Sequence, residues 1–123
     1  MDPVRFIVLY NRRQTTDSEG KFRSEYGGSR GVILPRETSY QVLLENVCRI
    51  IGVDDPSKFF IRMDFNYVAP EAISPTIPPI PVANDDDVKF FLAENADVTT
   101  RSPLRVVCLP LVLGTGEAQQ KVT

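Results

Sequence analysis

Alternation of apolar and polar positions predicts most of the strands in this chain. The clearest case is residues 59–68, where aromatic and aliphatic side chains occupy every second position and polar ones lie between them. Residues 4–10 and 104–111 are rich in β-branched and other apolar residues, so we expect a strand from each. A shorter apolar run, residues 32–34, predicts a short strand that ends at Pro35, because proline has no backbone N–H to donate within a sheet.

A period near 3.6 predicts two helices. Over residues 39–51 the apolar side chains recur at i, i+3, i+4, i+7 and i+11, which places them on one stripe of a helix. Thr38 or Ser39 suits the N-cap of this helix, and Gly52 suits its C-terminal end. A second, shorter helix is expected over residues 84–95, because an N-cap asparagine precedes another inward apolar face.

The remaining segments predict turns and loops. Residues 11–24 are polar and basic and contain a glycine, which indicates a turn or mobile loop. Residues 26–31 are glycine-rich, but no Gly-Lys-Ser/Thr follows as in a phosphate loop, so a hairpin turn is favoured. Residues 69–81 hold five prolines and cannot form a central strand, although a short edge strand over 80–83 is compatible. Residues 113–123 are predicted to be a flexible tail.

The predicted order is strand, strand, helix, strand, short strand, short helix, strand. This order is typical of an α+β fold of the ubiquitin-like β-grasp kind, with a mixed sheet of four to five strands, one main helix and a second short helix. A right-handed crossover through the main helix would make the first and last strands parallel neighbours at the centre of the sheet. We expect residues 1–112 to form this single domain.

The composition argues against catalysis. The 123 residues include no histidine, which removes the commonest general base and most zinc sites. No dinucleotide fingerprint is present, so we expect no catalytic residue, metal, cofactor or small-molecule substrate. Cys48 and Cys108 lie in apolar runs and favour buried free thiols, although a disulfide stays open at this stage. Neither a signal peptide nor an apolar run of about 20 residues is seen, which predicts an intracellular protein without a membrane partner.

Charge is divided unevenly along the chain. Residues 1–52 carry eight basic and six acidic side chains (net +2), and residues 53–123 carry six and ten (net −4), which sum to −2. Two halves of opposite sign can attract other copies or charged partners, or the asymmetry can be chance scatter over a solvated surface. The net acidity argues against binding nucleic acid by bulk charge. The basic side chains of residues 12–30 nevertheless keep an accessory DNA-binding role open as the alternative.

The first and last predicted strands offer a candidate contact surface. If every second residue from Val4 onward faces the helix, the other face carries two arginines and four aliphatic side chains. These outward positions are Arg5, Ile7, Leu9, Arg105, Val107 and Leu109. Such a mixture is suited to protein contact, unless the proline-rich segment folds over it and buries it.

Three consecutive aspartates, Asp85, Asp86 and Asp87, open the second predicted helix. Carboxylates in a first turn complement the helix dipole. Successive helical residues point about 100° apart, which argues against convergence on a metal ion. Helix capping is therefore the favoured interpretation, and an acidic docking surface is compatible with it.

Four segments, residues 25–28 (EYGG), 36–40 (RETSY), 79–92 (PIPVANDDDVKFFL) and 102–106 (SPLRV), carry a family resemblance in their order and spacing. Together they resemble the Phox-and-Bem-type (PB-one-like) domains found near the N-termini of plant Mutator-like transposases and their domesticated relatives. The resemblance covers about residues 4–109.

The resemblance implies a β-grasp domain that mediates oligomerisation, with a protein partner or a second copy. In such domains a basic residue of the first strand meets an acidic surface of the neighbour. Carried over, the basic face is Arg5, Arg12, Arg13 and Arg105, and the acidic face is Asp64, Asp85, Asp86 and Asp87. The exposed apolar patch is Ile7, Leu9, Val107 and Leu109. The resemblance further implies a nuclear location, with DNA contacted only through other domains.

Overall fold

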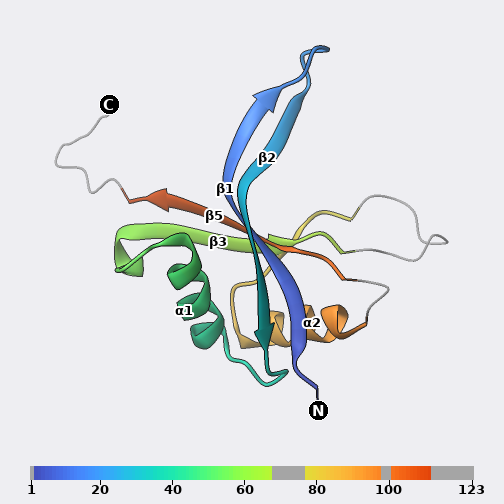
Figure 1. Ribbon diagram of the computed structural model, residues 1–123, viewed down its shortest axis with the longest axis vertical. Helices are drawn as coiled ribbons and strands as arrows, with labels where there is room; N and C mark the ends of the chain where they lie inside the picture. The colour runs from blue at the N-terminus through green and yellow to red at the C-terminus, as the bar shows by residue number, and fades with distance from the viewer. Residues whose placement is uncertain (1, 68–76, 98–100, 112–123) are drawn as a thin grey trace.

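The computed structural model describes residues 2–67, 77–97 and 101–111. These residues form an α+β structure with one mixed sheet and two α-helices (Figure 1). Its elements are β1 (Val4–Thr16), β2 (Phe22–Leu34), α1 (Tyr40–Ile51), the 3₁₀ turn η1 (Pro56–Lys58), β3 (Phe59–Phe65), β4 (Ile80–Pro81), α2 (Asp85–Ala96) and β5 (Leu104–Pro110). The predicted order of strands and helices is confirmed, but the second helix is not shorter than the first as expected, because α1 and α2 each have 12 residues.

The sheet has five strands in the order β2-β1-β5-β3-β4. β1 and β5 lie side by side and parallel, with Val8 opposite Leu104 and Leu9 opposite Arg105. The other neighbouring pairs are antiparallel. The predicted adjacency of the first and last strands is therefore confirmed, and so is the mixed character of the sheet.

Both helices begin at the predicted caps. At the start of α1 the Ser39 hydroxyl accepts a hydrogen bond from the Val42 N–H at 3.2 Å, and Gly52 ends the helix in the left-handed region at φ 79°. At the start of α2 the Asn84 side chain accepts from the Asp87 N–H at 2.9 Å. These bonds satisfy backbone groups that have no partner within the helix.

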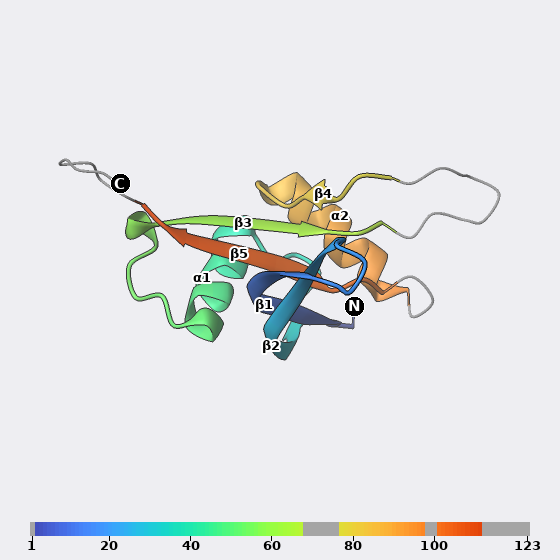
Figure 2. The same cartoon turned by 90° about the horizontal axis from the view of Figure 1, so that it is seen from above.

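The hydrophobic core lies between the sheet and the two helices, which both pack against one sheet face (Figure 1 and Figure 2). Phe91 of α2 is fully buried, and its ring contacts Phe6 and Phe65 edge-on at centroid distances of 5.1 and 5.0 Å. The other fully buried side chains come from both helices, from the inner face of the strands and from Val82, which lies between β4 and α2. Among the described residues, neither helix is long and apolar enough to cross a membrane.

The largest departure from expectation is in residues 11–24, which were expected to be a loop. β1 continues to Thr16 and β2 already begins at Phe22, so the prediction is wrong and these residues form a long β-hairpin. Its turn lies at residues 17–21, where an Asp17 carboxylate oxygen accepts from two backbone N–H groups and Gly20 adopts a φ of 82°. The distal part, residues 11–27, is called the hairpin arm here, and it projects beyond the rest of the sheet (Figure 1).

The glycines expected in a hairpin turn lie instead within β2, which corrects that prediction too. Gly28 is opposite Tyr10, and an added Cβ at Gly28 would lie 2.3 Å from the Tyr10 ring. Glycine is needed there because the aromatic ring lies against the neighbouring backbone. Beside this pair Asn11 has a φ of 57°, yet the residues on either side of it keep one continuous register with β2.

Candidate interaction surface

The outer face of the sheet is the face opposite the helices. Along β1 the side chains of Val4, Phe6 and Val8 are buried, whereas Ile7 between them is 47% exposed. On β5 the same alternation leaves Leu109 55% exposed. Leu9 and Val107 are half-buried, so the predicted apolar patch lies on the outer face but is only partly open.

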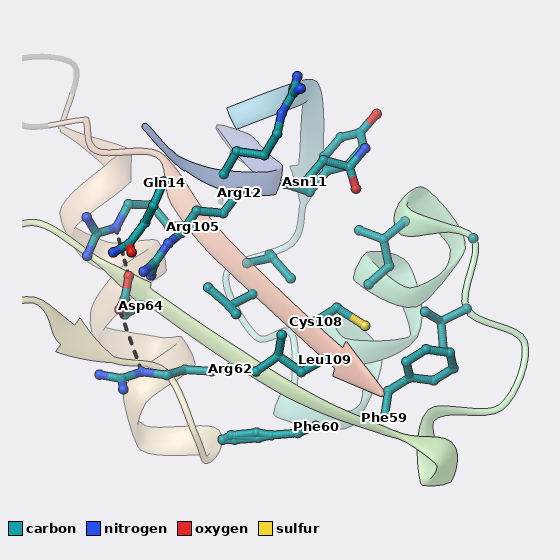
Figure 3. Close-up of a pocket in the computed structure, with 18 of the residues that line it drawn as sticks. Asn11, Arg12, Gln14, Phe59, Phe60, Arg62, Asp64, Arg105, Cys108 and Leu109 are labelled. Carbon is teal, nitrogen blue, oxygen red and sulfur yellow. Dashed lines mark hydrogen bonds and ion pairs between the residues drawn. The ribbon is translucent and has the colours of Figure 1, made fainter. Parts of the chain in front are cut away.

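A groove of about 1280 Å³, called the outer groove here, runs from this face between the hairpin arm and strands β5 and β3 to the C-terminal end of α1, where Ile51, Gly52 and Val53 line it (Figure 3). Its apolar wall includes Phe59, Phe60, Val107 and Leu109. Its charged lining consists of Arg12, Arg13, Arg62, Arg105 and Asp64. Four arginines against one aspartate give the described lining a net charge of +3.

An ion-pair cluster lies on the floor of the outer groove. Arg105 Nε donates to Asp64 Oδ1 at 2.8 Å, and Arg62 Nε lies 3.8 Å from Asp64 Oδ2. Figure 3 shows the two arginines reaching Asp64 from opposite sides. Asp64 and Arg105 are adjacent because they are direct partners in the antiparallel β3–β5 register. Their side chains are only 14% and 23% exposed, so this pair is largely withdrawn from solvent.

The structure brings together Asp64 and Arg105, which were assigned from the sequence to separate docking faces. Sequence reasoning placed Asp64 on an acidic face and Arg105 on a basic one, but the two neutralise each other within one chain. A register between distant strands determines the pair, and neither local sequence contains a signal for it. Arg62 was predicted to point outward on β3, but its place in the groove was missed.

Arg5 lies apart from this cluster, in a second hollow of about 640 Å³ called the β1–β2 hollow here. Its apolar lining includes Ile7, Leu9 and Ile33, and its second charge is Arg101. The two hollows meet where Leu9 of β1 lies beside Arg105 of β5. The predicted basic face is therefore divided, with Arg5 in the β1–β2 hollow and Arg12, Arg13 and Arg105 in the outer groove.

The three aspartates of α2 have different local roles. Asp85 Oδ1 accepts a hydrogen bond from the Tyr40 N–H at 2.7 Å, which ties the start of α2 to the start of α1. Asp87 Oδ2 accepts from the Ala83 N–H at 2.9 Å, while the Asp87 N–H donates to the Asn84 side chain, so Asp87 takes part in the cap of α2. Asp86 is exposed to solvent. The capping interpretation is confirmed for Asp87, and within the described ranges no group of three potential ligands could hold a metal ion.

The proposed cover of the outer face falls mostly on residues 69–76, which lie outside the described residues. From the same proline-rich segment, Pro79 contributes to the lining of the outer groove. This end of the segment therefore reaches the edge of the groove.

Both cysteines are free thiols, as predicted. Cys48 is buried on α1, and Cys108 is partly buried on β5. Burial raises the pKa of each thiol, and the charge of Cys108 raises the pKa of Cys48 further. The neutral thiol is favoured at both positions, which makes either one a poor nucleophile at neutral pH.

The outer face is thus strongly cationic. The two hollows together contain six arginines, and Asp64 is the one acidic side chain in their described lining. The arrangement has apolar walls for contact and guanidinium groups for carboxylates or other anions. No family model, no curated protein and no solved structure matches the chain.

Proposed function

We propose that this chain is a β-grasp interaction module of the PB-one-like kind, which binds an acidic partner surface on the outer face of its sheet. The central parallel pair of first and last strands, with both helices on one face, supports the β-grasp assignment. The observation that carries the functional proposal is the excess of arginines over carboxylates in the two hollows.

Affinity at such a surface depends on both its apolar and its charged parts. Exposed ion pairs contribute only about 0–1 kcal/mol each, so arginines alone give weak binding. Burying about 300 Å² of apolar surface would contribute ~7 kcal/mol before the costs of association. Ile7 and Leu109 expose apolar area beside the arginines, so an acidic segment with interspersed aliphatic residues is the partner that fits.

Such a segment can belong to another protein or to a second copy of this chain. Of the four residues predicted as the acidic face, Asp86 is the one whose carboxylate has no contact described here, since Asp85 and Asp87 accept hydrogen bonds and Asp64 is paired. Front-to-back pairing of copies would therefore join the arginine face to the start of α2. This pairing would use one freely exposed carboxylate rather than the four expected from the sequence.

The proposal is tested with a fluorescein-labelled peptide that alternates glutamate and leucine. Fluorescence anisotropy should detect binding at about 0.05 M salt and much weaker binding at about 0.5 M, because screening shortens the reach of surface charges. Arg62→Glu should weaken binding at least about 10-fold, since it replaces attraction by repulsion in the outer groove. Arg5→Glu should have a similar effect if the peptide also crosses the β1–β2 hollow.

Arg49→Glu is the matched control, because Arg49 is an exposed arginine of α1, and α1 packs on the other sheet face. It makes the same change in net charge and should leave the affinity within about 2-fold of the parent value. Equal losses in Arg49→Glu and Arg62→Glu would mean that bulk charge explains the binding and would refute a specific site. Sedimentation of the parent chain and of Arg62→Glu at both salt concentrations then tests whether the outer face also binds a second copy, because association through this face should be lost in Arg62→Glu.

The alternative, accessory DNA binding, rests on the basic side chains of the hairpin arm. The arm carries Arg12, Arg13, Lys21 and Arg23, but it also carries Asp17, Glu19 and Glu25. One of its arginines, Arg23, lies 3.6 Å from the Asp17 carboxylate. A salt-dependent mobility shift of duplex DNA at about physiological ionic strength, lost in Arg12→Glu, would favour this alternative over the acidic partner.

A further inference from the structure

The hairpin arm leaves the sheet as a two-stranded ribbon. β1 pairs with β5 at Val8 and Leu9, and the described pairing beyond these residues is between β1 and β2 alone. The side chains from Asn11 to Thr16 are all exposed. A two-stranded hairpin is only marginally stable in water, and its open edges can pair with another strand. The arm is therefore the part of the sheet that an added strand would stabilise most.

The two edges of the arm differ in what they could pair with. On the β1 edge the charged side chains are Arg12 and Arg13, with no acid among residues 12–16. That edge therefore offers no opposite charge to a second copy of itself. The β2 edge carries charges of both signs and two aromatic residues, Phe22 and Tyr26, of which Phe22 is 78% exposed. The composition of the β2 edge thus permits a second copy as its partner.

Two-fold symmetry restricts the possible registers. A two-fold axis perpendicular to the sheet keeps each side chain on its own face, so residues directly opposite each other must differ by an even number of positions. With the axis at Ser24, Arg23 lies opposite Glu25 of the second copy, and Phe22 lies opposite Tyr26 of the second copy. The axis generates each of these pairs twice.

Other two-fold registers within β2 lack this complementarity. An axis at Arg23 places the two guanidinium groups opposite each other, and an axis at Glu25 does the same with the two carboxylates. Axes further along the strand place Glu25 opposite uncharged residues. Among axes placed from Phe22 to Leu34, Ser24 alone sets opposite charges directly across the new edge.

We propose that two copies of this chain associate through antiparallel pairing of their β2 edges, centred on Ser24. The pairing joins the two arms into a four-stranded antiparallel ribbon. Within each chain Arg13 already lies opposite Glu25, so Glu25 would have an arginine on both sides. Arg23 is free to turn toward the second copy, because its contact with Asp17 is long and solvent-exposed. This interface goes beyond the proposed function, because it lies on β2 and not on the outer face. Of the arginines that line the two hollows, Arg13 alone lies opposite a charged residue of the interface, and Arg13 keeps its pairing with Glu25 of the same chain.

The pairing spans residues 22–26 of each copy, which is a short contact. We therefore expect a weak dimer that depends on protein concentration, as is usual for interfaces well below about 1,200 Å². Sedimentation equilibrium over a range of concentrations should detect it. Complete absence of dimer up to about 1 mM would overturn the proposal.

Charge reversal tests the register. Arg23→Glu places two pairs of carboxylates across the interface, and Glu25→Arg places two pairs of guanidinium groups there. Either variant alone should dimerise at least about 10-fold more weakly than the parent. An equimolar mixture should form a heterodimer with nearly parental affinity, because each variant then faces the opposite charge at both positions. The double variant Arg23→Glu, Glu25→Arg should likewise recover self-association.

Arg62→Glu separates this interface from the outer groove. It should leave dimerisation unchanged and weaken binding of the acidic peptide. Arg23→Glu should instead weaken dimerisation and leave peptide binding unchanged. Far-UV circular dichroism must show that each variant retains its fold. Failure of the mixture to associate, or loss of the dimer in Arg62→Glu, would overturn the proposed pairing and leave the outer-face proposal standing.

Discussion

Removing the Asp64 carboxylate should have opposite effects on stability and on binding. In Asp64→Ala the Arg105 guanidinium loses a charge-assisted hydrogen bond of 2.8 Å in a largely buried position. Such bonds contribute about 1.5–3 kcal/mol to the free energy of unfolding. Because the pair is still partly exposed to solvent, we expect a loss at the lower end, ~1.5 kcal/mol. For a chain of this size that corresponds to a fall in Tm of about 6 °C.

The same substitution should strengthen binding of an acidic peptide in the outer groove. It removes the one acidic side chain of the described lining and raises the net charge there from +3 to +4. A unit charge about 8 Å from a ligand carboxylate contributes ~0.5 kcal/mol in a water-like dielectric and ~2 kcal/mol at an effective dielectric of about 20. The affinity should therefore rise by about 2-fold to 30-fold at low salt.

The assay combines urea denaturation with peptide anisotropy on the same preparations. Glu45→Ala is the matched control, because it removes an exposed carboxylate from α1, which packs on the other sheet face, and should change neither quantity much. If Asp64 instead belongs to an acidic docking face, its removal should weaken association of the chain. Weaker peptide binding in Asp64→Ala than in the parent would refute the conclusion that Asp64 neutralises positive charge in the outer groove.

Four further predictions test the fold and its thiols. Phe91→Ala should lower the free energy of unfolding by about 3–5 kcal/mol in urea denaturation, because the Phe91 ring is fully buried between Phe6 and Phe65; a loss below about 1 kcal/mol would contradict that packing. Gly28→Ala should cost about 1–3 kcal/mol, because the new Cβ meets the Tyr10 ring, whereas Gly27→Ala has its nearest neighbours at 3.6 Å and should cost little; equal losses would show that the ring contact is unimportant. A dithiobis-nitrobenzoate assay near neutral pH should label Cys108 before Cys48, since Cys48 is more buried and both thiol pKa values are raised. Because the unfolded chain then ionises its thiols first, stability should fall as the pH rises above about 8.5, and a Cys48→Ala, Cys108→Ala variant should lack that part of the fall.

Local signals in the sequence predicted the helices and the central strands. Ser39 and Gly52 bracket α1 as expected, because capping depends on residues only a few positions apart. Strand β3 was found because its inner positions are apolar and its outer positions polar. In both cases one side of the helix or strand is buried. Burial of one side is what makes apolar residues recur at regular intervals in the sequence.

The hairpin arm was missed for the same physical reason. Both of its faces are exposed, so residues 11–16 have no apolar alternation to reveal a strand. The glycines near residue 27 were interpreted as a turn, although the actual turn is stabilised by the Asp17 side chain. An aspartate followed three residues later by a glycine was the available signal for that turn.

The ion pair between Asp64 and Arg105 could not be predicted from either local sequence. It depends on the register between two strands about 40 residues apart. The sequence did predict that both side chains point outward, and that part is correct. When the register between two strands is not known, the sequence does not tell whether an outward-facing charge pairs with a residue of the same chain or is left for a binding partner.

Asn11 has a consequence for how the arm is aimed. Its positive φ turns the backbone, while the residues before and after it stay matched to the same partners on β2. The direction in which the hairpin arm points therefore depends on the φ and ψ angles of Asn11. The β1–β2 register depends instead on the turn at residues 17–21. A substitution at Asn11 could swing the tip toward or away from the sheet and still leave every cross-strand neighbour in place.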